Sequence, residues 1–460
     1  MLLVSYEFLF FLAVLLALYY LLPGRFQWPL LLAASVLFYL SEGAFAIVFL
    51  ITTTVTTWFL ALRLEAMTER AAARVKELGL SGGEKRAFQA AVKQKKKRVL
   101  IAGLILNFGL LAVLKYTNFF LGNVDVLFFG GSGEGPYVDW LLPLGISYYT
   151  FQATGYLIDV YHKKIHAQKN LARYALFVSF FPQIVQGPIS RFDELAAQLT
   201  ESRRFDWLTI RLGLMRMLWG FFKKLVAADR IAPAVAVIVQ NPDQYQGIYV
   251  WIGMFAYMMQ MFADFTGGID IVIGAAQLFG IRLPENFNRP FSSRSLAEFW
   301  RRWHMTLMRW LREYIFFPVS TSRASQKLSG AARRFLGKGA GRRAPLYFAS
   351  VTVWLITGIW HGASWNFVAW GLANCAVLLI SQECSPLYRR FCSRFAWTAS
   401  RGYAAFEVAR TYLVFCMIEM FEYYSFDVVF SMFGSMFFGI RPWQVGGQAV
   451  LGRQEIYSTP

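Results

Sequence analysis

Two of the four histidines in this chain stand where an imidazole could perform acid–base chemistry. His361 ends the apolar stretch PLYFASVTVWLITGIW and is followed by GASWN. Histidine is the side chain whose ordinary pKa, about 6.5, lets it take a proton from an alcohol and return it to a leaving group near neutral pH. An imidazole after so long an apolar run is costly to bury, and Gly362 leaves backbone room for a substrate. We therefore predict His361 as a catalytic residue.

His304 lies in SLAEFWRRWHMTLMRWLREY, where Ser295 and Glu298 have the spacing of a capping box and predict the start of a helix. On a continuous helix, one face carries Trp300, Trp303, His304, Leu307, Trp310, Leu311 and Tyr314. His304 is then either a second functional group or a core imidazole on an aromatic stripe. The other two histidines, His162 and His166, fall in the basic stretch YHKKIHAQK, which predicts a solvated interfacial loop.

A second group of candidates consists of polar side chains inside apolar segments, where each is costly unless paired or hydrated. They are Gln152, Gln183, Gln186, Asp264, Asp270, Asn286 and Asn288, with Trp303 and Asn366 beside the histidines. Broken helices around them are predicted by Pro182, Gly187, Pro188, Gly267, Gly268, Pro284 and Pro290. The pattern predicts a polar chamber that supports the histidines and binds substrate. Two alternatives stay open: an ion pair of Asp264 with a neighbouring Arg, and helix capping by the Asn residues.

The elements that must position these groups are apolar helices. The chain has 460 residues, of which 57% are hydrophobic and only 16% are charged, and this composition excludes an ordinary soluble globule. Apolar runs begin at Phe8–Leu22 and recur to Gly439; the first is expected to be retained as a span, because no basic residue precedes it. The predicted fold class is all-α: one polytopic membrane domain over residues 1–460, with about ten to twelve crossings and several re-entrant or interfacial helices.

The charge pattern predicts which parts face the cytoplasm. The formal net charge is +19, with eleven Lys and Arg residues between Arg63 and Arg98 and eleven more between Arg301 and Arg343. By the positive-inside rule, both segments face the cytoplasm. The stretch Leu121–Trp140, which is acidic and rich in Gly, is the predicted external loop. The basic residues directly abut apolar runs, so binding to nucleic acid is not predicted.

Several chemistries are set aside on motif grounds. The chain contains no G-x-x-x-x-G-K-[ST], G-x-S-x-G or H-E-x-x-H motif and no carboxylate-rich cluster, so no metal site is predicted. The four cysteines, Cys375, Cys384, Cys392 and Cys416, form no C-x-x-C pair and sit in or beside apolar segments. That placement is typical of thiols used as small hydrophobes rather than of disulfides.

The segments around both histidines resemble a known family. PENFNRPFSSRSLAEFWRRWHMTLMRWLREYIFFP, FADFTGGIDIVIG and TGIWHGASWNFVAWG are similar to the membrane-bound O-acyltransferases, in particular to their bacterial polysaccharide branch. LLPLGISYYTFQATGYLIDVY and FPQIVQGPISRF are similar to the alginate O-acetyltransferase subgroup, and the resemblance covers Leu141 to Ile380. It implies that His361 is the catalytic histidine and His304 the second active-site histidine. The implied fold is an arc of helices around a thinned centre, where a tunnel from the cytoplasmic donor meets an outward funnel.

The resemblance also implies a reaction. A short acyl group, acetyl above all, passes from a cytoplasmic thioester, acetyl-CoA or an acyl-carrier protein, towards hydroxyls of an extracytoplasmic polysaccharide. No bound cofactor is implied, and a secreted or membrane-anchored partner, acyltransferase-like or esterase-like, is expected to finish the transfer outside the lipid bilayer. The strongly basic STSRASQKLSGAARRFLGKGAGRRA between the histidines is longer than expected for the alginate subgroup, whose members usually continue into further helices where this chain stops.

Two alternatives remain beside this interpretation. The first is D-alanyl transfer to teichoic acid from a carrier-protein thioester, because FEYYSF at Phe421–Phe426 resembles the short tyrosine motif of that pathway, although an aromatic helix end also explains it. The second belongs to another class, a transporter or polysaccharide export channel, which broken helices and buried polar groups would equally suit. Loading of the acetyl group from acetyl-CoA without a carrier protein would argue against the D-alanyl alternative. Polysaccharide flux without any acyl donor would favour the transport alternative.

Overall fold

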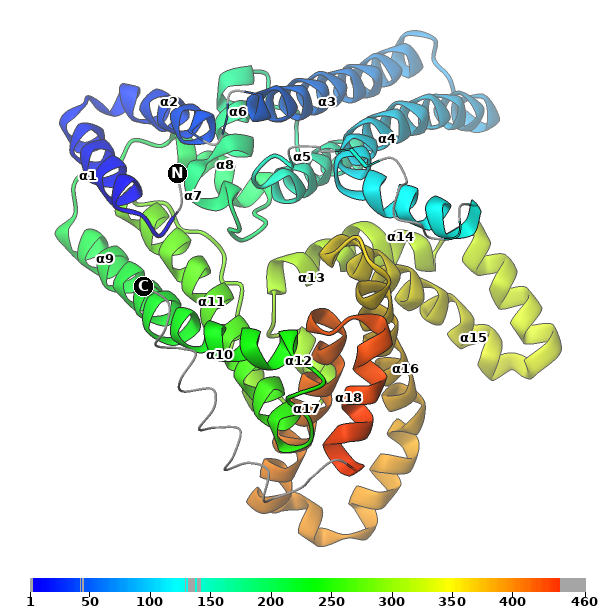
Figure 1. Ribbon diagram of the computed structural model, residues 1–460. Helices are drawn as coiled ribbons and strands as arrows, with labels where there is room; N and C mark the ends of the chain where they lie inside the picture. The colour runs from blue at the N-terminus through cyan, green and yellow to red at the C-terminus, as the bar shows by residue number, and fades with distance from the viewer. Residues whose placement is uncertain are drawn as a thin grey trace. The chain divides into compact units, whose positions relative to one another are not determined.

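The computed structural model describes residues 3–41, 43, 45–128, 130, 137–138 and 142–438. Within those ranges every regular element is a helix, which confirms the all-α prediction. Contacts divide the chain into two compact units: residues 1–221, 266–288 and 300–353 form the first, and residues 222–265, 289–299 and 354–460 form the second. The prediction of a single domain stays a prediction. Figure 1 follows the helices in chain order.

The first unit contains most of the N-terminal helices. They are α1 (Tyr6–Leu21), α2 (Gln27–Leu40), α3 (Ala46–Glu77), α4 (Gly82–Phe128), α5 (Ile146–Tyr161), α6 (Leu171–Ser179), α7 (Phe181–Ile184), α8 (Phe192–Thr200) and α9 (Trp207–Phe221). It also holds α13 (Met305–Leu311), the π-helical turn Arg312–Phe316 and α14 (Phe317–Ser320). Helices α3, α4 and α5 pack on one another, and α3 and α4 form the long hairpin visible in Figure 1.

The second unit contains α10 (Asp229–Gln240), α16 (Trp365–Arg394), α17 (Arg401–Tyr423) and α18 (Phe426–Phe438), together with most of α12 (Leu296–Trp300). Two long helices belong to both units, because the division falls inside α11 (Ile248–Leu278) and inside α15 (Arg323–His361). A π-helical turn at Phe222–Ala228 precedes α10, and a 3-10 turn at Pro290–Ser292 precedes α12.

In the described part of the chain, four helices are long and apolar enough to cross a membrane, judged by length and composition: α3, α4, α11 and α16. Two shorter apolar helices, α1 and α18, have 16 and 13 residues. The apolar hydrocarbon layer is about 30 Å thick, whereas the 47 residues of α4 extend about 70 Å. Its basic first part therefore projects beyond the apolar layer. These helices support a polytopic membrane protein, and the number of crossings stays a prediction.

Glycines set the closest helix contacts in the first unit. A Cβ on Gly213 of α9 would lie 2.9 Å from the carbonyl oxygen of Gly274 of α11, and one on Gly220 would lie 2.6 Å from that of Gly267. Such small-residue contacts let helices in a membrane approach backbone to backbone. The glycines of α11 thus serve packing and do not break the helix.

This finding corrects the expectation of a break at Gly267 and Gly268, because α11 runs without interruption through both. Gly268 is instead needed because the Gln186 amide nitrogen lies 1.4 Å from where a Cβ would stand. The breaks predicted near Pro182 and Pro284 are confirmed: α7 is a single turn, and no helix covers residues 281–289. The predicted external loop 121–140 is wrong at its start, where α4 continues to Phe128, and most of its remainder lies outside the described residues.

Candidate active site

His304 occupies a break between two helices. The Ser295 hydroxyl accepts the Glu298 amide N–H at 3.2 Å, so the predicted helix start is confirmed, but α12 ends at Trp300. The continuous face predicted for residues 300–314 is wrong. His304 has a left-handed backbone, with φ 45° and ψ 49°, and stands immediately before α13. Side chains other than Gly rarely adopt this conformation, at a cost of about 1–3 kcal/mol, so the surrounding contacts must hold it in place.

Asn286 supplies those contacts. Its side-chain oxygen accepts hydrogen bonds from the Thr306 amide at 3.1 Å and the Thr306 hydroxyl at 2.9 Å, and its backbone carbonyl accepts the Met305 amide at 2.9 Å. Asn286 thus takes the place of the preceding turn of the predicted helix and supplies the acceptors for the first amides of α13. The side chains of Asn286 and His304 are both buried, with 0% and 3% exposed surface.

The same oxygen fixes the tautomer of His304. His304 Nδ1 lies 3.2 Å from Asn286 Oδ1, which already accepts two hydrogen bonds from Thr306. A side-chain amide oxygen carries no hydrogen and can only accept, so Nδ1 must carry the proton in this contact. In the neutral ring, Nε2 is then the basic nitrogen.

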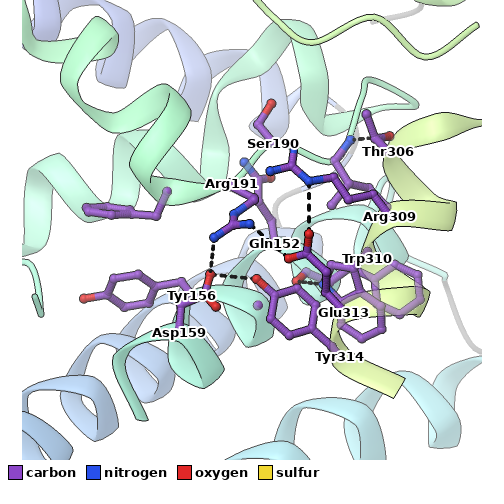
Figure 2. Close-up of a pocket in the computed structure, with 14 residues that line it drawn as sticks. Gln152, Tyr156, Asp159, Ser190, Arg191, Thr306, Arg309, Trp310, Glu313 and Tyr314 are labelled. Carbon is purple, nitrogen blue, oxygen red and sulfur yellow. Dashed lines mark hydrogen bonds and ion pairs between the residues drawn. The ribbon is translucent and has the colours of Figure 1, made fainter. Parts of the chain in front are cut away.

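A network of charged side chains anchors α13 from its other side, as Figure 2 shows. Arg191 Nη1 lies 2.9 Å from the Glu313 carboxylate, and its Nη2 lies 3.5 Å from Asp159. The Tyr314 hydroxyl donates to Asp159 at 2.7 Å. Burial raises the pKa of Tyr314, and the hydrogen bond to Asp159 raises it further, so this hydroxyl remains a donor in the folded protein. The cavity inside the network has about 20 Å³, room for one water molecule.

His361 has a different setting in the second unit. It is the last residue of α15, and 23% of its side chain is exposed. The centre of its ring lies 4.4 Å from the ring centre of Trp370 and 6.4 Å from that of Phe367, both on α16. A Cβ on Gly371 would meet the Trp354 carbonyl oxygen at 2.4 Å, so glycine permits α16 to approach α15 beside the histidine. His361 is thus held by aromatic rings while part of it stays accessible.

The sequence analysis did not select two acids of α17, of which Glu422 faces this histidine and Glu419 contacts Trp370. Glu422 Oε1 lies 3.6 Å from His361 Nδ1, which is long for a hydrogen bond but close for a charge contact. Glu419, one turn earlier on α17, accepts the indole N–H of Trp370 at 3.0 Å. The Tyr257 hydroxyl of α11 also donates to Glu422. A carboxylate on the Nδ1 side orients the ring and leaves Nε2 as the basic nitrogen.

One signal could have revealed these acids. Glu419 and Glu422 stand in or beside an apolar segment, as do the aspartates Asp264 and Asp270 that were selected on that ground. The expectation that Gly362 leaves room for a substrate is wrong, because a Cβ there would lie 2.0 Å from the Phe367 ring. The space above Gly362 is filled by an aromatic side chain.

The other predicted site residues are joined in separate local contacts. Gln152 and Gln183 both donate to the Phe177 carbonyl at 3.3 Å, and Gln183 also accepts the Ser190 hydroxyl at 3.0 Å. Trp303 is buried and packs edge-to-face on Phe287, with ring centres 5.0 Å apart. The glutamine contacts are polar and buried, as predicted, and Gln152 also lines the small cavity of about 20 Å³ together with Ser190 and Thr306.

The predicted aspartates are engaged in ion pairs. Asp264 is 48% exposed and lies 2.6 Å from Lys224, so the ion-pair alternative fits it, with Lys in place of Arg. Asp270 lies 2.9 Å from Arg216, which also pairs with Glu285 at 2.6 Å.

The remaining candidates are two asparagines and the two histidines of the predicted loop. Asn288 is exposed and its backbone amide donates to the Arg302 carbonyl at 2.9 Å, whereas Asn366 is half-buried in the first turn of α16. His166, predicted in a solvated loop, is 99% exposed and contacts Glu65 at 2.7 Å. His162, in the same loop, caps the end of α5. Among the described residues, no three His, Cys, Asp or Glu side chains gather as metal ligands.

The structure has apolar helices long enough to span a bilayer, a buried histidine in one unit and a half-buried histidine that faces a carboxylate in the other. These features define an all-α integral membrane protein with acid–base groups inside its helices. Comparison with known proteins gives the family. The sequence profile of the membrane-bound O-acyltransferase family matches residues 164–426, and the chain belongs to that family.

Individual relatives agree with this assignment. A probable alginate O-acetylase of Azotobacter vinelandii is 34% identical over 80% of this chain and 66% of its own length. A peptidoglycan O-acetyltransferase of Helicobacter pylori is 33% identical over 64% of this chain and 57% of its own. A teichoic acid D-alanyltransferase of Bacillus subtilis is 29% identical over 56% of this chain and 62% of its own. The matched region thus spans less than two thirds of the length of each of these relatives.

Proposed function

We propose that this chain is a membrane O-acyltransferase that passes an acetyl group from a thioester donor towards hydroxyls of a cell-envelope polysaccharide. The observation that carries the proposal is the pairing of His361 with Glu422, an imidazole whose Nδ1 faces a carboxylate and whose Nε2 is left basic. Membership of the O-acyltransferase family and similarity to proteins named as alginate and peptidoglycan O-acetyltransferases support it.

In the proposed reaction, His361 is the general base. Its Nε2 takes the proton of the acceptor hydroxyl while the oxygen attacks the thioester carbonyl carbon, and Glu422 stabilises the imidazolium that forms. The tetrahedral intermediate collapses with cleavage of the carbon–sulfur bond, and the imidazolium returns the proton to the departing thiolate. The products are an O-acetyl ester and a free thiol. A second route, in which His361 takes the acyl group transiently, needs the same basic nitrogen.

His304 is proposed as the second active-site histidine. With Nδ1 bound to Asn286, its Nε2 would accept a proton from a substrate group or, when protonated, stabilise an oxyanion. Acetyl-CoA is the proposed donor, steered by basic helix ends such as that of α4. The bacterial inner membrane, with several crossings, is the proposed location, and an extracytoplasmic partner protein is proposed to complete transfer to the polysaccharide.

The test is the O-acetyl content of envelope polysaccharide from cells that carry His361→Ala, beside cells with the parent chain. We expect acetylation to fall to the level of cells without the gene, since a positioned acid or base contributes about 10²–10⁴-fold in rate. His166→Ala, an exposed histidine on another segment, serves as the matched control and should keep parental acetylation. Acetylation that persists in His361→Ala cells with normal protein levels would refute the proposal.

A second measurement separates the alternatives. Purified protein in proteoliposomes is supplied with acetyl-CoA labelled in the acetyl group, with no carrier protein present. Transfer of label to a polysaccharide fragment supports the acetyl donor, whereas a strict need for a carrier protein would favour the D-alanyl alternative. Polysaccharide flux without any donor, undiminished by His361→Ala, would favour the transport alternative.

A further inference from the structure

A basic cavity lies within the first unit, and its lining includes none of the residues described around His304 or His361. It has a volume of about 650 Å³ and is formed by the last part of α3, the first part of α4 and the end of α5. Four lysines line it, Lys85, Lys93 and Lys96 on α4 and Lys163 after α5, and none of the described lining residues is Asp or Glu. Cavities of a few hundred Å³ bind small molecules, and the charge of this one selects anions.

Lys96 is the most informative of these lysines. Only 6% of its surface is exposed, and its ammonium donates to the Thr68 hydroxyl at 2.7 Å and to the Tyr161 carbonyl at 3.4 Å. The ammonium also lies 5.4 Å from the centre of the Tyr161 ring. All of these partners are neutral. A buried ammonium without a carboxylate partner is costly, and an anion in the cavity would offset that cost.

Lys163 adds a second, independent observation. Its backbone has φ 61°, in the left-handed region, at the position after a helix end where glycine is strongly favoured. The amide of Lys163 donates to the Val160 carbonyl at 3.0 Å, as that type of helix end requires. A lysine therefore stands where the backbone favours glycine, and its side chain lines the cavity.

The position of the cavity along α4 indicates the source of the anion. The apolar run that begins at Val99 starts three residues after Lys96, and the preceding residues from Lys93 are almost all basic. The cavity therefore lies at the junction between the basic and apolar parts of a candidate membrane span. Phosphate groups of phospholipids occupy that depth, and basic pockets between helices at this boundary bind their headgroups.

We propose that this cavity binds the phosphodiester headgroup of an anionic phospholipid, with Lys96 contacting the phosphate and Lys93 and Lys163 contacting it from the cavity rim. The small side chains Ala71 and Ala72 of α3 leave room for the headgroup. Burial and the charge of Lys164 lower the pKa of His162, which also lines the cavity, so the lysines carry the positive charge. The proposal concerns lipid binding and holds whether or not the chain transfers acyl groups.

The test is native mass spectrometry of the full chain in detergent, titrated with dioleoyl phosphatidylglycerol and, separately, with dioleoyl phosphatidylcholine. We expect tight binding of the first lipid and weak binding of the second. The double variant Lys93→Gln/Lys163→Gln should weaken phosphatidylglycerol binding roughly twentyfold, since each interfacial Lys contributes about fivefold. Both lysines are exposed, so the variant should fold, and Lys96→Met tests the buried contact separately.

The matched control is Lys95→Gln/Lys97→Gln, which removes the same charge from exposed positions that do not line the cavity. It should change binding less than twofold. Equal losses in both double variants would overturn the proposal, because they would show attraction by general surface charge. Complete displacement of the lipid by millimolar inorganic phosphate or acetyl-CoA would also overturn it and would assign the cavity to a soluble phosphate ligand.

Discussion

The surroundings of His304 and His361 differ in almost every respect. His304 is 3% exposed, has a left-handed backbone, and is bound through Nδ1 to an amide oxygen that also holds the start of α13. His361 is 23% exposed, is the last residue of α15, and faces a carboxylate at 3.6 Å. The His304 ring takes part in the hydrogen bonds that hold the start of α13, whereas the His361 ring is contacted by aromatic and charged side chains of other helices. Substitution at position 304 should therefore lower the stability of the folded protein, and substitution at position 361 should lower the rate of acyl transfer.

The two histidines offer the most direct way to break this comparison. His361→Ala should lower the rate of acyl transfer by about 10²–10⁴-fold and leave thermal unfolding nearly unchanged. His304→Ala should also destabilise the chain by roughly 2–4 kcal/mol, because a buried ring is lost and its hydrogen bond to Asn286 with it. Transfer rates and unfolding midpoints in detergent measure both effects. Equal loss of stability in the two variants would contradict the comparison.

Asn286→Ala tests whether Asn286 holds the His304 segment. The change removes the acceptor for the Thr306 amide, the Thr306 hydroxyl and His304 Nδ1, and each buried unsatisfied donor costs about 1–3 kcal/mol. We expect a loss of roughly 3 kcal/mol or more in the free energy of unfolding, measured with denaturant in detergent. Asn288→Ala is the control, because that side chain is exposed, and it should change stability by less than about 0.5 kcal/mol.

Glu422→Gln tests whether the charge of the acid that faces His361 contributes to catalysis. The variant keeps size and hydrogen-bonding capacity but removes the charge that stabilises the imidazolium. We expect kcat to fall about tenfold or more while KM for the donor changes less than twofold, because the interaction strengthens only in the transition state. Unfolding should be little affected. A rise in KM with unchanged kcat would assign Glu422 to substrate binding.

Gly371→Ala tests the helix contact beside His361. The new Cβ would lie 2.4 Å from the Trp354 carbonyl oxygen, so α16 must shift away from α15, at a cost of about 1–3 kcal/mol. Gly434→Ala on α18 is the matched control, since nothing lies within 4 Å of its Cβ position, and it should be neutral or slightly stabilising. Differential scanning fluorimetry of both variants measures the difference.

Tyr314→Phe should give the smallest effect, through the network that anchors α13. Loss of the hydroxyl that donates to Asp159 should cost only about 0.5–1.5 kcal/mol near neutral pH, because Asp159 keeps its ion pairs with Arg191 and Lys164. The folded pKa of Tyr314 is raised above its unfolded value, so the stabilisation is fully present below about pH 10 and declines as pH rises above it. The stability difference between parent and variant, measured from pH 7 to pH 11, should therefore shrink above pH 10.

The amino-acid sequence predicts much of this structure, because local signals dominate it. The all-helical class, the start of α12 at Ser295 and the breaks at Pro182 and Pro284 follow from hydropathy, capping residues and proline. The continuity of α11 through Gly267 could not be predicted from these local signals. The glycines of α11 are required by packing against the neighbouring helix α9 and not by the backbone conformation of α11 itself.

In the candidate site, too, local sequence signals identify some residues, whereas contacts between distant segments could not be predicted. Both histidines could be selected for their apolar surroundings, but their partners come from segments distant in sequence. Asn286 was selected without its link to His304, and the break before α13 depends on that link. Glu422 is absent from the predicted site residues, although an acid beside an apolar segment needs a partner as much as Asp264 does.

The glycine pairs between α9 and α11 limit where a lipid-borne substrate could enter the protein. Where Gly213 meets Gly274 and Gly220 meets Gly267, the two backbones leave no gap wide enough for a hydrocarbon tail. That seam is closed to lateral entry from the bilayer. A lipid-borne substrate that reached the interior sideways would have to pass between other helices, and bulky residues placed along this seam would push the helices apart without blocking such a route.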